Sequence, residues 1–205
     1  MPGIICGHVA RSRIGKSNGG LGGAGLALAG LIVGYFFLAL QVIGFGVVVP
    51  ASRGFLEKAT TLNEALQLKN AIGSYFTEYR KYPFRELSES QVYRSDAKLM
   101  GILLASDLEA AKTGSNPRRI PFYSGRRATP IGKGRFRSGV LTDADGGGEL
   151  WDPWADYYYV KIDADGDGQI LGPNGEVIKA AVIVWSAGED GISGNEDDVT
   201  TWEAD

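Results

Sequence analysis

The sequence predicts an α+β protein that is held in a membrane by one transmembrane helix. An uncharged run extends from Gly22 to Val49, a helical repeat of apolar residues follows it, and β-forming segments separated by Asp/Gly-rich turns occupy the second half. We therefore expect a transmembrane helix, then an amphipathic helix and a short helix packed on a small antiparallel sheet, with an acidic loop near the C-terminus.

The uncharged run 22–49 is long enough to cross a bilayer. A hydrocarbon core about 30 Å thick requires roughly 20 apolar residues in a helix, the form that satisfies backbone polar groups in lipid. A cleaved signal peptide fits poorly, because its apolar core covers only about 7–15 residues. A buried core helix is the alternative, but such helices are seldom apolar on all sides over this length.

The charges beside this run predict its orientation. His8, Arg11, Arg13 and Lys16 precede it, and no acidic residue occurs before Pro50. A positive cluster beside a first span usually stays in the cytoplasm. We therefore expect a single-pass protein of the inner membrane with a periplasmic C-terminal domain. The expected parts are a cytoplasmic basic stub (1–21), the anchor (22–49), a linker (50–60) and the periplasmic domain (61–205).

Small residues are dense from Gly22 to Gly34, and in lipid they let helices approach closely. Together with Gly7-His8-Val9-Ala10-Arg11, this stretch resembles a small bacterial membrane domain of unknown function over roughly the first 45 residues. That domain carries two spans joined by a glycine-rich basic connector. Residues 1–6 are too short for the first span, so the resemblance implies a reduced or truncated copy and no chemistry.

Charge is divided sharply along the chain. All 24 acidic residues follow the anchor; residues 112–137 contain eight Lys/Arg and no acid, whereas residues 143–205 contain sixteen acids and two lysines. A basic run can indicate nucleic-acid binding, but no readout helix or interleaved aromatic pattern accompanies this one. We expect a solvated loop and no nucleic-acid partner, and the acidic third suggests bound cations.

The cysteine and histidine content excludes several kinds of site in the expected periplasmic domain. Cys6 and His8 are the only residues of their types, and both precede the anchor. The domain therefore has no disulfide, no histidine for a catalytic triad and no histidine or cysteine for a zinc site. We expect a protein that is not an enzyme. A hydrolase that uses carboxylate pairs is a less favoured alternative, because the acids cluster in turns.

Two helices are expected in the domain. Thr61-x-x-Glu64 has the pattern of a capping box that opens the first helix, which ends at Tyr82-Pro83. Ser95-Asp96 opens a second, shorter helix with apolar residues at Leu99, Met100, Leu103 and Leu104. The residues spaced for the inner face of the first helix are Leu62, Ala65, Leu66, Lys69, Ile72, Phe76 and Tyr79.

The second half reads as strands and turns. Residues 157–162 are rich in β-formers and predict a strand. Residues 163–168 predict a turn, and Ile170-Leu171 predicts a short strand after it. Asn174-Gly175 is a further turn, and residues 180–185 resemble a buried strand. Helices that precede strands in this way are typical of an α+β domain.

The first acidic turn has part of a calcium-loop pattern. Asp163, Asp165 and Asp167 stand at positions 1, 3 and 5 of an EF-hand loop, and Gly168 and Ile170 match its later positions. The closing glutamate of that motif is absent, and strands rather than helices flank the turn. A hairpin turn of this composition needs no metal, so both interpretations remain open.

The last acidic loop is a stronger candidate for a cation. Asp190, Asp197 and Asp198 would repel one another on a compact glycine-rich loop unless a cation neutralised them. Calcium suits such a loop because it accepts carboxylates and backbone carbonyls in flexible geometry. On spacing alone, an open solvated acidic tail is equally compatible.

Several segments also occur in a characteristic order between about residues 60 and 202. They are Leu66–Pro83, Asn116-Pro117-Arg118, Asp152-Pro153-Trp154, Asp163–Asp167, Val184–Gly191, Asp197-Asp198-Val199 and Trp202. As a set they resemble the major pseudopilin of type II secretion systems. That resemblance implies a calcium-type loop with the side chains of Asp190, Asp197 and Asp198 and the carbonyls of Ala187 and Ile192 as ligands. It also implies a role in protein transport, with other pseudopilins or secretion-system proteins as partners.

The chain departs from that family at its start. Family members begin with a prepilin peptidase site, in which a glycine precedes an apolar helix that carries a glutamate at its fifth position. The anchor here has no glutamate, and no apolar helix follows Gly54-Phe55. A stand-alone envelope interaction module, which kept the fold but not filament assembly, is therefore the alternative function.

Overall fold

The computed structural model describes residues 2–17, 22–43, 49–84, 86–106, 115–142 and 148–202. The chain divides into two compact units, Met1–Leu56 and Glu57–Asp205. Helix α3, Val49–Tyr79, begins in the first unit and continues into the second.

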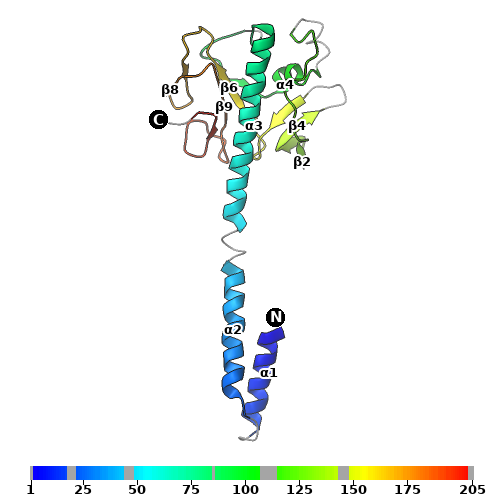
Figure 1. Ribbon diagram of the computed structural model, residues 1–205, viewed down its shortest axis with the longest axis vertical. Helices are drawn as coiled ribbons and strands as arrows, with labels where there is room; N and C mark the ends of the chain where they lie inside the picture. The colour runs from blue at the N-terminus through cyan, green and yellow to red at the C-terminus, as the bar shows by residue number, and fades with distance from the viewer. Residues whose placement is uncertain are drawn as a thin grey trace. The chain divides into compact units, whose positions relative to one another are not determined.

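The first unit contains two antiparallel helices, α1 (Pro2–Lys16) and α2 (Ala24–Ile43) (Figure 1). Glycines allow them to touch: a Cβ on Gly34 would lie 2.6 Å from Cγ1 of Ile4, and one on Gly7 would lie 2.9 Å from Cγ of Leu31. Nε2 of His8 lies 2.9 Å from the Tyr35 hydroxyl. The expected basic stub thus contains a helix, and the predicted close approach through small residues is present.

Helix α2 has the properties of a membrane span. Residues Ala24–Val42 form a 19-residue segment that is long and apolar enough to cross a bilayer, and its side chains are almost entirely exposed. It is the one such segment in the described part of the chain. By length and composition, α2 is a candidate transmembrane helix.

Helix α3 starts earlier than predicted. It begins at Val49, so the expected linker 50–60 is helical and the expected capping box is wrong. Thr61 Oγ1 instead donates to the carbonyl of Glu57 at 2.8 Å, one turn back within the helix. Glu64 faces the core, where it binds Arg126 and Tyr158. Pro50 lies in the first turn, where its missing N–H removes no intrahelical bond.

The buried face of α3 also differs in part from the prediction. Ala65 and Ile72 are buried as predicted, whereas Leu68 and Tyr75 are buried although they were not predicted for this face. Leu62 and Leu66 remain 38% and 39% exposed. The face is therefore rotated toward residues 61, 64, 68 and 75 by the position of the sheet, which an amphipathic count alone cannot supply.

The short helix α4, Ala97–Leu103, confirms the second helix prediction. Asp96 caps it by accepting the N–H groups of Lys98 and Leu99 at 3.0 and 3.2 Å. Leu99, Met100 and Leu103 are buried against α3 and the sheet.

The central sheet is antiparallel, with the order β1-β6-β9-β10. Its strands are β1 (Tyr93–Arg94), β6 (Tyr159–Ile162), β9 (Val182–Ser186) and β10 (Val199–Thr200). One face, which includes Val160 and Val184, packs on α3 and α4. The other face buries Ile183 and Trp185 against Ile170 and Ile178. This arrangement is consistent with the predicted α+β class.

Three two-stranded ribbons surround the sheet: β2–β3, β4–β5 and β7–β8. Their strands are β2 (Thr129–Gly132), β3 (Arg135–Arg137), β4 (Gly139–Thr142), β5 (Gly148–Trp151), β7 (Ile170–Leu171) and β8 (Val177–Ile178). The basic run, expected as a solvated loop, therefore contains a β-hairpin.

Candidate functional site

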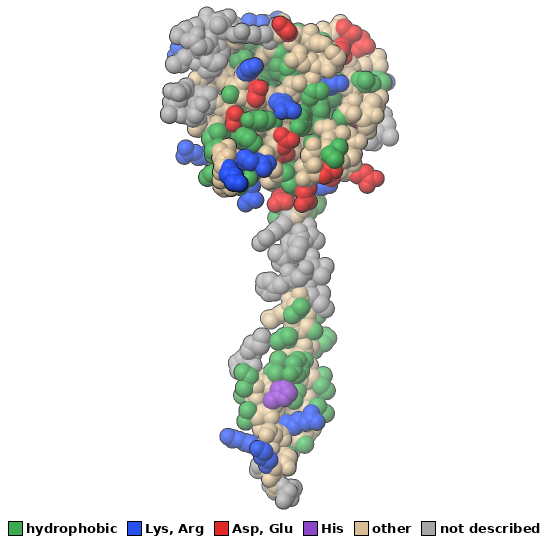
Figure 2. Space-filling model, turned by 180° about the vertical axis from the view of Figure 1, so that it is seen from behind, with side chains coloured by type: hydrophobic (Ala, Val, Ile, Leu, Met, Phe, Trp, Pro, Cys, Tyr) green, Lys and Arg blue, Asp and Glu red, His purple; other side chains and the backbone are tan. Residues whose placement is uncertain are grey.

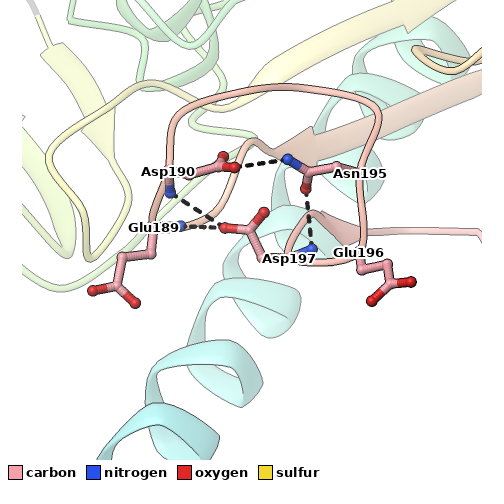
Figure 3. Close-up of a pocket in the computed structure, with 5 residues that line it drawn as sticks. All are labelled: Glu189, Asp190, Asn195, Glu196 and Asp197. Atoms are coloured by element: carbon pink, nitrogen blue, oxygen red, sulfur yellow. Dashed lines mark hydrogen bonds between the residues drawn. The ribbon is translucent and has the colours of Figure 1, made fainter.

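The C-terminal acidic loop connects β9, one of the two inner strands of the sheet, to the edge strand β10. It leaves β9 after Ser186 and returns as β10 at Val199, and these two residues are paired in the antiparallel register. The sheet thus holds both ends of the loop together, and Asp190, Asn195 and Asp197 face one another across the loop (Figure 3). The strand pairing explains why residues far apart in the loop meet.

Asp197 and Asp190 form the centre of this loop. Oδ2 of Asp197 accepts the N–H groups of Glu189 and Asp190 at 2.8 and 3.2 Å. Oδ1 of Asp190 accepts the N–H of Ile192 at 2.7 Å, and Oδ2 accepts Nδ2 of Asn195 at 2.8 Å. Figure 3 shows these side chains directed across the loop toward one another. Each of these two carboxylates therefore accepts two hydrogen bonds from groups of the same loop.

Asp198 has an unsatisfied oxygen. Its Oδ2 accepts the N–H of Gly194 at 2.7 Å, whereas its Oδ1 is buried and has no hydrogen-bond partner among the described residues. Burial raises the pKa of Asp198, and the charges of Asp197 and Asp190 raise it further. A buried oxygen without a donor is costly, and a cation is one group that would satisfy it.

Gly188 makes room for Asp197. Its φ is +68°, and a Cβ there would overlap the Asp197 carboxylate and lie 2.6 Å from the Asp197 carbonyl oxygen. An L-residue with a side chain fits neither this conformation nor this space. Glycine at position 188 is thus required for the carboxylate to reach the backbone of residues 189 and 190.

The two residues expected to contribute carbonyl ligands lie in different surroundings. Ala187, directly after β9, is fully buried, whereas Ile192 lies at the tip of the loop and is 63% exposed. Glu189, Asp190, Asn195, Glu196 and Asp197 line a shallow depression (Figure 3). In this structure the loop satisfies Asp190 and Asp197 through backbone and amide donors.

The other acidic turn gains a residue that the sequence did not indicate. Asp163 accepts the N–H groups of Gly166 and Gly168 at 2.7 and 2.9 Å, and Asp167 accepts that of Gln169 at 2.8 Å. Glu89 accepts the N–H of Ala164, and its carboxylate, with those of Asp163 and Asp165, forms a group with ligand oxygens within 4.8 Å of one another. This is the one such group among the described residues; Asp167, Asp190, Asp197 and Asp198 are not in it.

No motif could have identified Glu89. It lies between α3 and β1, in a segment whose path depends on tertiary packing. Its neighbour in space, Ala164, is 75 positions away in the chain. The three spaced aspartates signalled the turn, whereas the fourth carboxylate became visible only in the fold.

A second polar centre that the sequence did not indicate joins the sheet to residues 152–156. Asp152 is fully buried; its Oδ1 accepts the N–H groups of Trp154 and Asp156, both at 2.9 Å. Its Oδ2 accepts the Ser186 hydroxyl at 2.6 Å. Burial raises the pKa of Asp152 to about 6, although these hydrogen bonds oppose the shift. The start of the acidic loop is thereby tied to the protein interior.

Comparison with known proteins supports the interpretation of the first unit. Residues 1–44 match a family model described as a domain of unknown function (DUF4190), a small membrane-type domain. The predicted resemblance of the first 45 residues is thus confirmed, and with α2 it indicates a membrane-anchored chain. Neither the curated proteins nor the solved structures gave a match.

Proposed function

We propose that the chain is a membrane-anchored, pseudopilin-like protein without enzymatic activity, and that its periplasmic domain is stabilised by calcium. In this proposal it acts in type II secretion or a related pilus-like assembly. The observation that carries the proposal is the acidic loop between β9 and β10, in which Asp198 buries an oxygen that has no hydrogen-bond partner in the described part of the chain. The order of long helix, antiparallel sheet and acidic closing loop supports it.

Calcium is the cation that suits this loop. Asp190, Asp197 and Asp198 supply carboxylates, and the carbonyls of Ala187 and Ile192 complete the set of oxygen ligands. The raised pKa of Asp198 reflects burial and the neighbouring negative charges, and a divalent cation would reverse the effect of those charges. Calcium accepts six to eight oxygens in flexible geometry, whereas magnesium requires tight octahedral geometry.

The proposed role of the ion is structural. The loop covers the end of the sheet, where Trp185 Nε1 donates to Ser193 Oγ at 2.9 Å and the Trp185 ring meets Trp202. A ligand that binds only the folded state stabilises that state, by an amount that grows with the logarithm of its concentration over Kd. Calcium would therefore hold β10 against β9 and keep this aromatic contact closed.

The turn at Asp163, Asp165 and Asp167 is the weaker candidate for calcium. Both oxygens of Asp163 already accept backbone N–H groups, so an ion would have to compete with them. Glu89 adds a carboxylate to Asp163 and Asp165. We expect this turn to contribute less calcium-dependent stability than the C-terminal loop.

The placement of the carboxylates favours a non-enzymatic role. Asp152 has the raised pKa that a general acid requires, but it is fully buried and its two oxygens are occupied by structural hydrogen bonds. The acidic depression is shallow and lies on an exposed loop. Enzyme sites are usually deeper and enclose a substrate.

An assembly role can be tested through self-association in a membrane. The full chain, with Cys6→Ser and Thr77→Cys for dye attachment, is reconstituted in vesicles with millimolar calcium. We expect energy transfer between donor- and acceptor-labelled copies that exceeds the transfer between copies of residues 1–56 that keep Cys6 and carry the dyes there. Equal transfer would assign all association to the first unit and would favour a stand-alone envelope module.

A further inference from the structure

The β2–β3 hairpin and the residues just before it carry positive side chains that form no ion pair or hydrogen bond within the described part of the chain. Arg127, Lys133 and Arg137 are exposed, and none has an ion pair or hydrogen bond from its side chain to any described residue. By contrast, Arg118 and Arg126 pair with Glu78 and Glu64. We call Arg127, Lys133 and Arg137, with Ile131 beside them, the basic patch.

The hairpin presents this patch because of strand alternation. Phe136 turns inward and its ring lies 6.3 Å from that of Trp151. Its neighbours in the strand, Arg135 and Arg137, therefore face the opposite side. Arg135 reaches back to the Ala155 carbonyl at 3.2 Å, whereas Arg137 does not make such a contact. Ile131 is 47% exposed, so the patch also offers an apolar side chain.

An opposite patch lies on the C-terminal loop. The side chains of Glu189 and Glu196 point away from those of Asp190, Asn195 and Asp197 (Figure 3). Neither carboxylate accepts a hydrogen bond or forms an ion pair with a described residue, and neither is among the proposed calcium ligands. Ile192 is 63% exposed beside them. We call Glu189, Glu196 and Ile192 the acidic patch.

The two patches lie on opposite sides of the second unit. Strand β2 and the C-terminal loop lie on either side of α3 (Figure 1). In Figure 2 a group of basic side chains lies at the lower left of the same unit and a group of acidic side chains at its lower right, with both signs mixed between them. The two patches cannot neutralise each other within one molecule. When two copies lie side by side, the basic patch of one can face the acidic patch of the other. Each patch contains an exposed isoleucine and charges of one sign.

We infer that the basic patch of one copy binds the acidic patch of the next copy in a head-to-tail contact. This inference rests on the assembly role proposed above and assigns the surfaces that would carry it. Exposed ion pairs are individually weak, so the contact would form poorly between free domains in dilute solution. Anchoring in one membrane raises the effective concentration of the partner and limits its orientations. A head-to-tail contact repeats from copy to copy.

Charge reversal with complementation tests the inference in the full chain. The vesicles are zwitterionic, and the dye is attached at Thr77→Cys in the Cys6→Ser background. The hairpin variant carries Lys133→Glu and Arg137→Glu, and the loop variant carries Glu189→Lys and Glu196→Lys. Lys98→Glu with Arg119→Glu is the matched control for the hairpin variant, because it makes the same change in net charge outside both patches.

We expect each patch variant to lower energy transfer roughly threefold or more, as does 1 M salt, whereas the control stays at the wild-type level. A mixture of donor-labelled hairpin variant and acceptor-labelled loop variant should recover the transfer, since the reversed charges again attract. Wild-type transfer that neither variant changes would overturn the inference and leave the assembly role standing.

Two other outcomes also count against it. If the wild type shows no transfer beyond that of residues 1–56, the proposed assembly role fails first. Anionic vesicles provide the last arm, because the basic patch could instead contact lipid headgroups. An effect of the hairpin variant that occurs only in anionic vesicles would assign the patch to the lipid surface and overturn the contact between copies.

Discussion

The Ser186 hydroxyl donates a 2.6 Å hydrogen bond to Oδ2 of Asp152, and this contact joins the last residue of β9 to a buried loop. Ser186 Oγ also accepts the N–H of Gly188 at 3.3 Å. The first residues of the acidic loop are therefore held by two hydrogen bonds of Ser186 Oγ. Because one of these bonds goes to the buried Asp152 carboxylate, the stability of this contact should depend on pH.

Asp152 should make the domain less stable as pH rises. Burial raises its pKa from the ordinary value of 3.8 to about 6 in the fold, so the folded state holds the proton more tightly. Its contribution is fully present below about pH 4 and is lost as pH rises through 6; the shift corresponds to about 2–3 kcal/mol. Denaturant unfolding of residues 57–205 at pH 4.5 and 7.5 measures it. Asp152→Asn should remove this part of the pH dependence; an unchanged dependence would contradict the assignment.

The bond between Tyr158 and Glu64 should stabilise the packing of α3 on the sheet. The Tyr158 hydroxyl donates to Glu64 Oε2 at 2.8 Å, and both residues are buried. Tyr158→Phe leaves a buried carboxylate with one donor fewer, so we expect a loss of about 1–3 kcal/mol in unfolding free energy. Tyr159→Phe is the control, since its hydroxyl meets the partly exposed Asp156 at 2.8 Å. Equal losses of unfolding free energy in the two variants would show that burial does not make the Tyr158–Glu64 hydrogen bond more stabilising than the partly exposed one.

Gly188 and Gly191 provide a matched pair for the acidic loop. Their φ angles are +68° and +69°, but only at Gly188 would a Cβ meet Asp197; at Gly191 nothing lies within 4 Å. Gly191→Ala should cost about 1 kcal/mol through backbone strain. Gly188→Ala should cost about 1–3 kcal/mol more, because it also displaces the Asp197 carboxylate. Thermal unfolding of both variants measures the difference. Equal melting temperatures would contradict the contact between position 188 and the Asp197 carboxylate.

Local patterns predicted the elements whose signals are local. Asp96 caps α4 as its sequence indicated, and the turn at residues 163–168 connects strands at the expected place. The start of α3 was missed because Thr61 and Glu64 have the capping pattern but are used differently. Thr61 bonds within the helix, and Glu64 is drawn inward by Tyr158 and Arg126.

The candidate sites show the same limit. Spacing suggested Asp190, Asp197 and Asp198 as candidates because they share one continuous loop, and their role as ligands stays a prediction. It could not identify Glu89 beside Asp163, nor Asp152 beneath Ser186, because those contacts join segments that meet only through tertiary packing. The hairpin within the basic run was also missed, since its sequence is dominated by charge and glycine.

The orientation of the chain is a separate prediction. The basic residues Arg11, Arg13 and Lys16 precede α2, so the C-terminal domain should lie in the periplasm. A reporter enzyme that is active only in the periplasm, fused after Asp205, should be active in cells. A matched fusion to a reporter that is active only in the cytoplasm should be silent. The reverse pattern would contradict the orientation.

Calcium-dependent melting of residues 57–205 tests the central proposal most directly. At a hundredfold excess over Kd, a ligand specific for the fold contributes about 2.7 kcal/mol, which corresponds to roughly 5–10 °C for a domain of this size. We expect that rise in millimolar calcium relative to chelator, a much smaller rise in magnesium, and little rise for Asp197→Ala. Asp165→Ala should keep most of it. If calcium leaves the melting temperature of the wild-type domain unchanged, the loop between β9 and β10 is not a calcium site and the proposal is wrong.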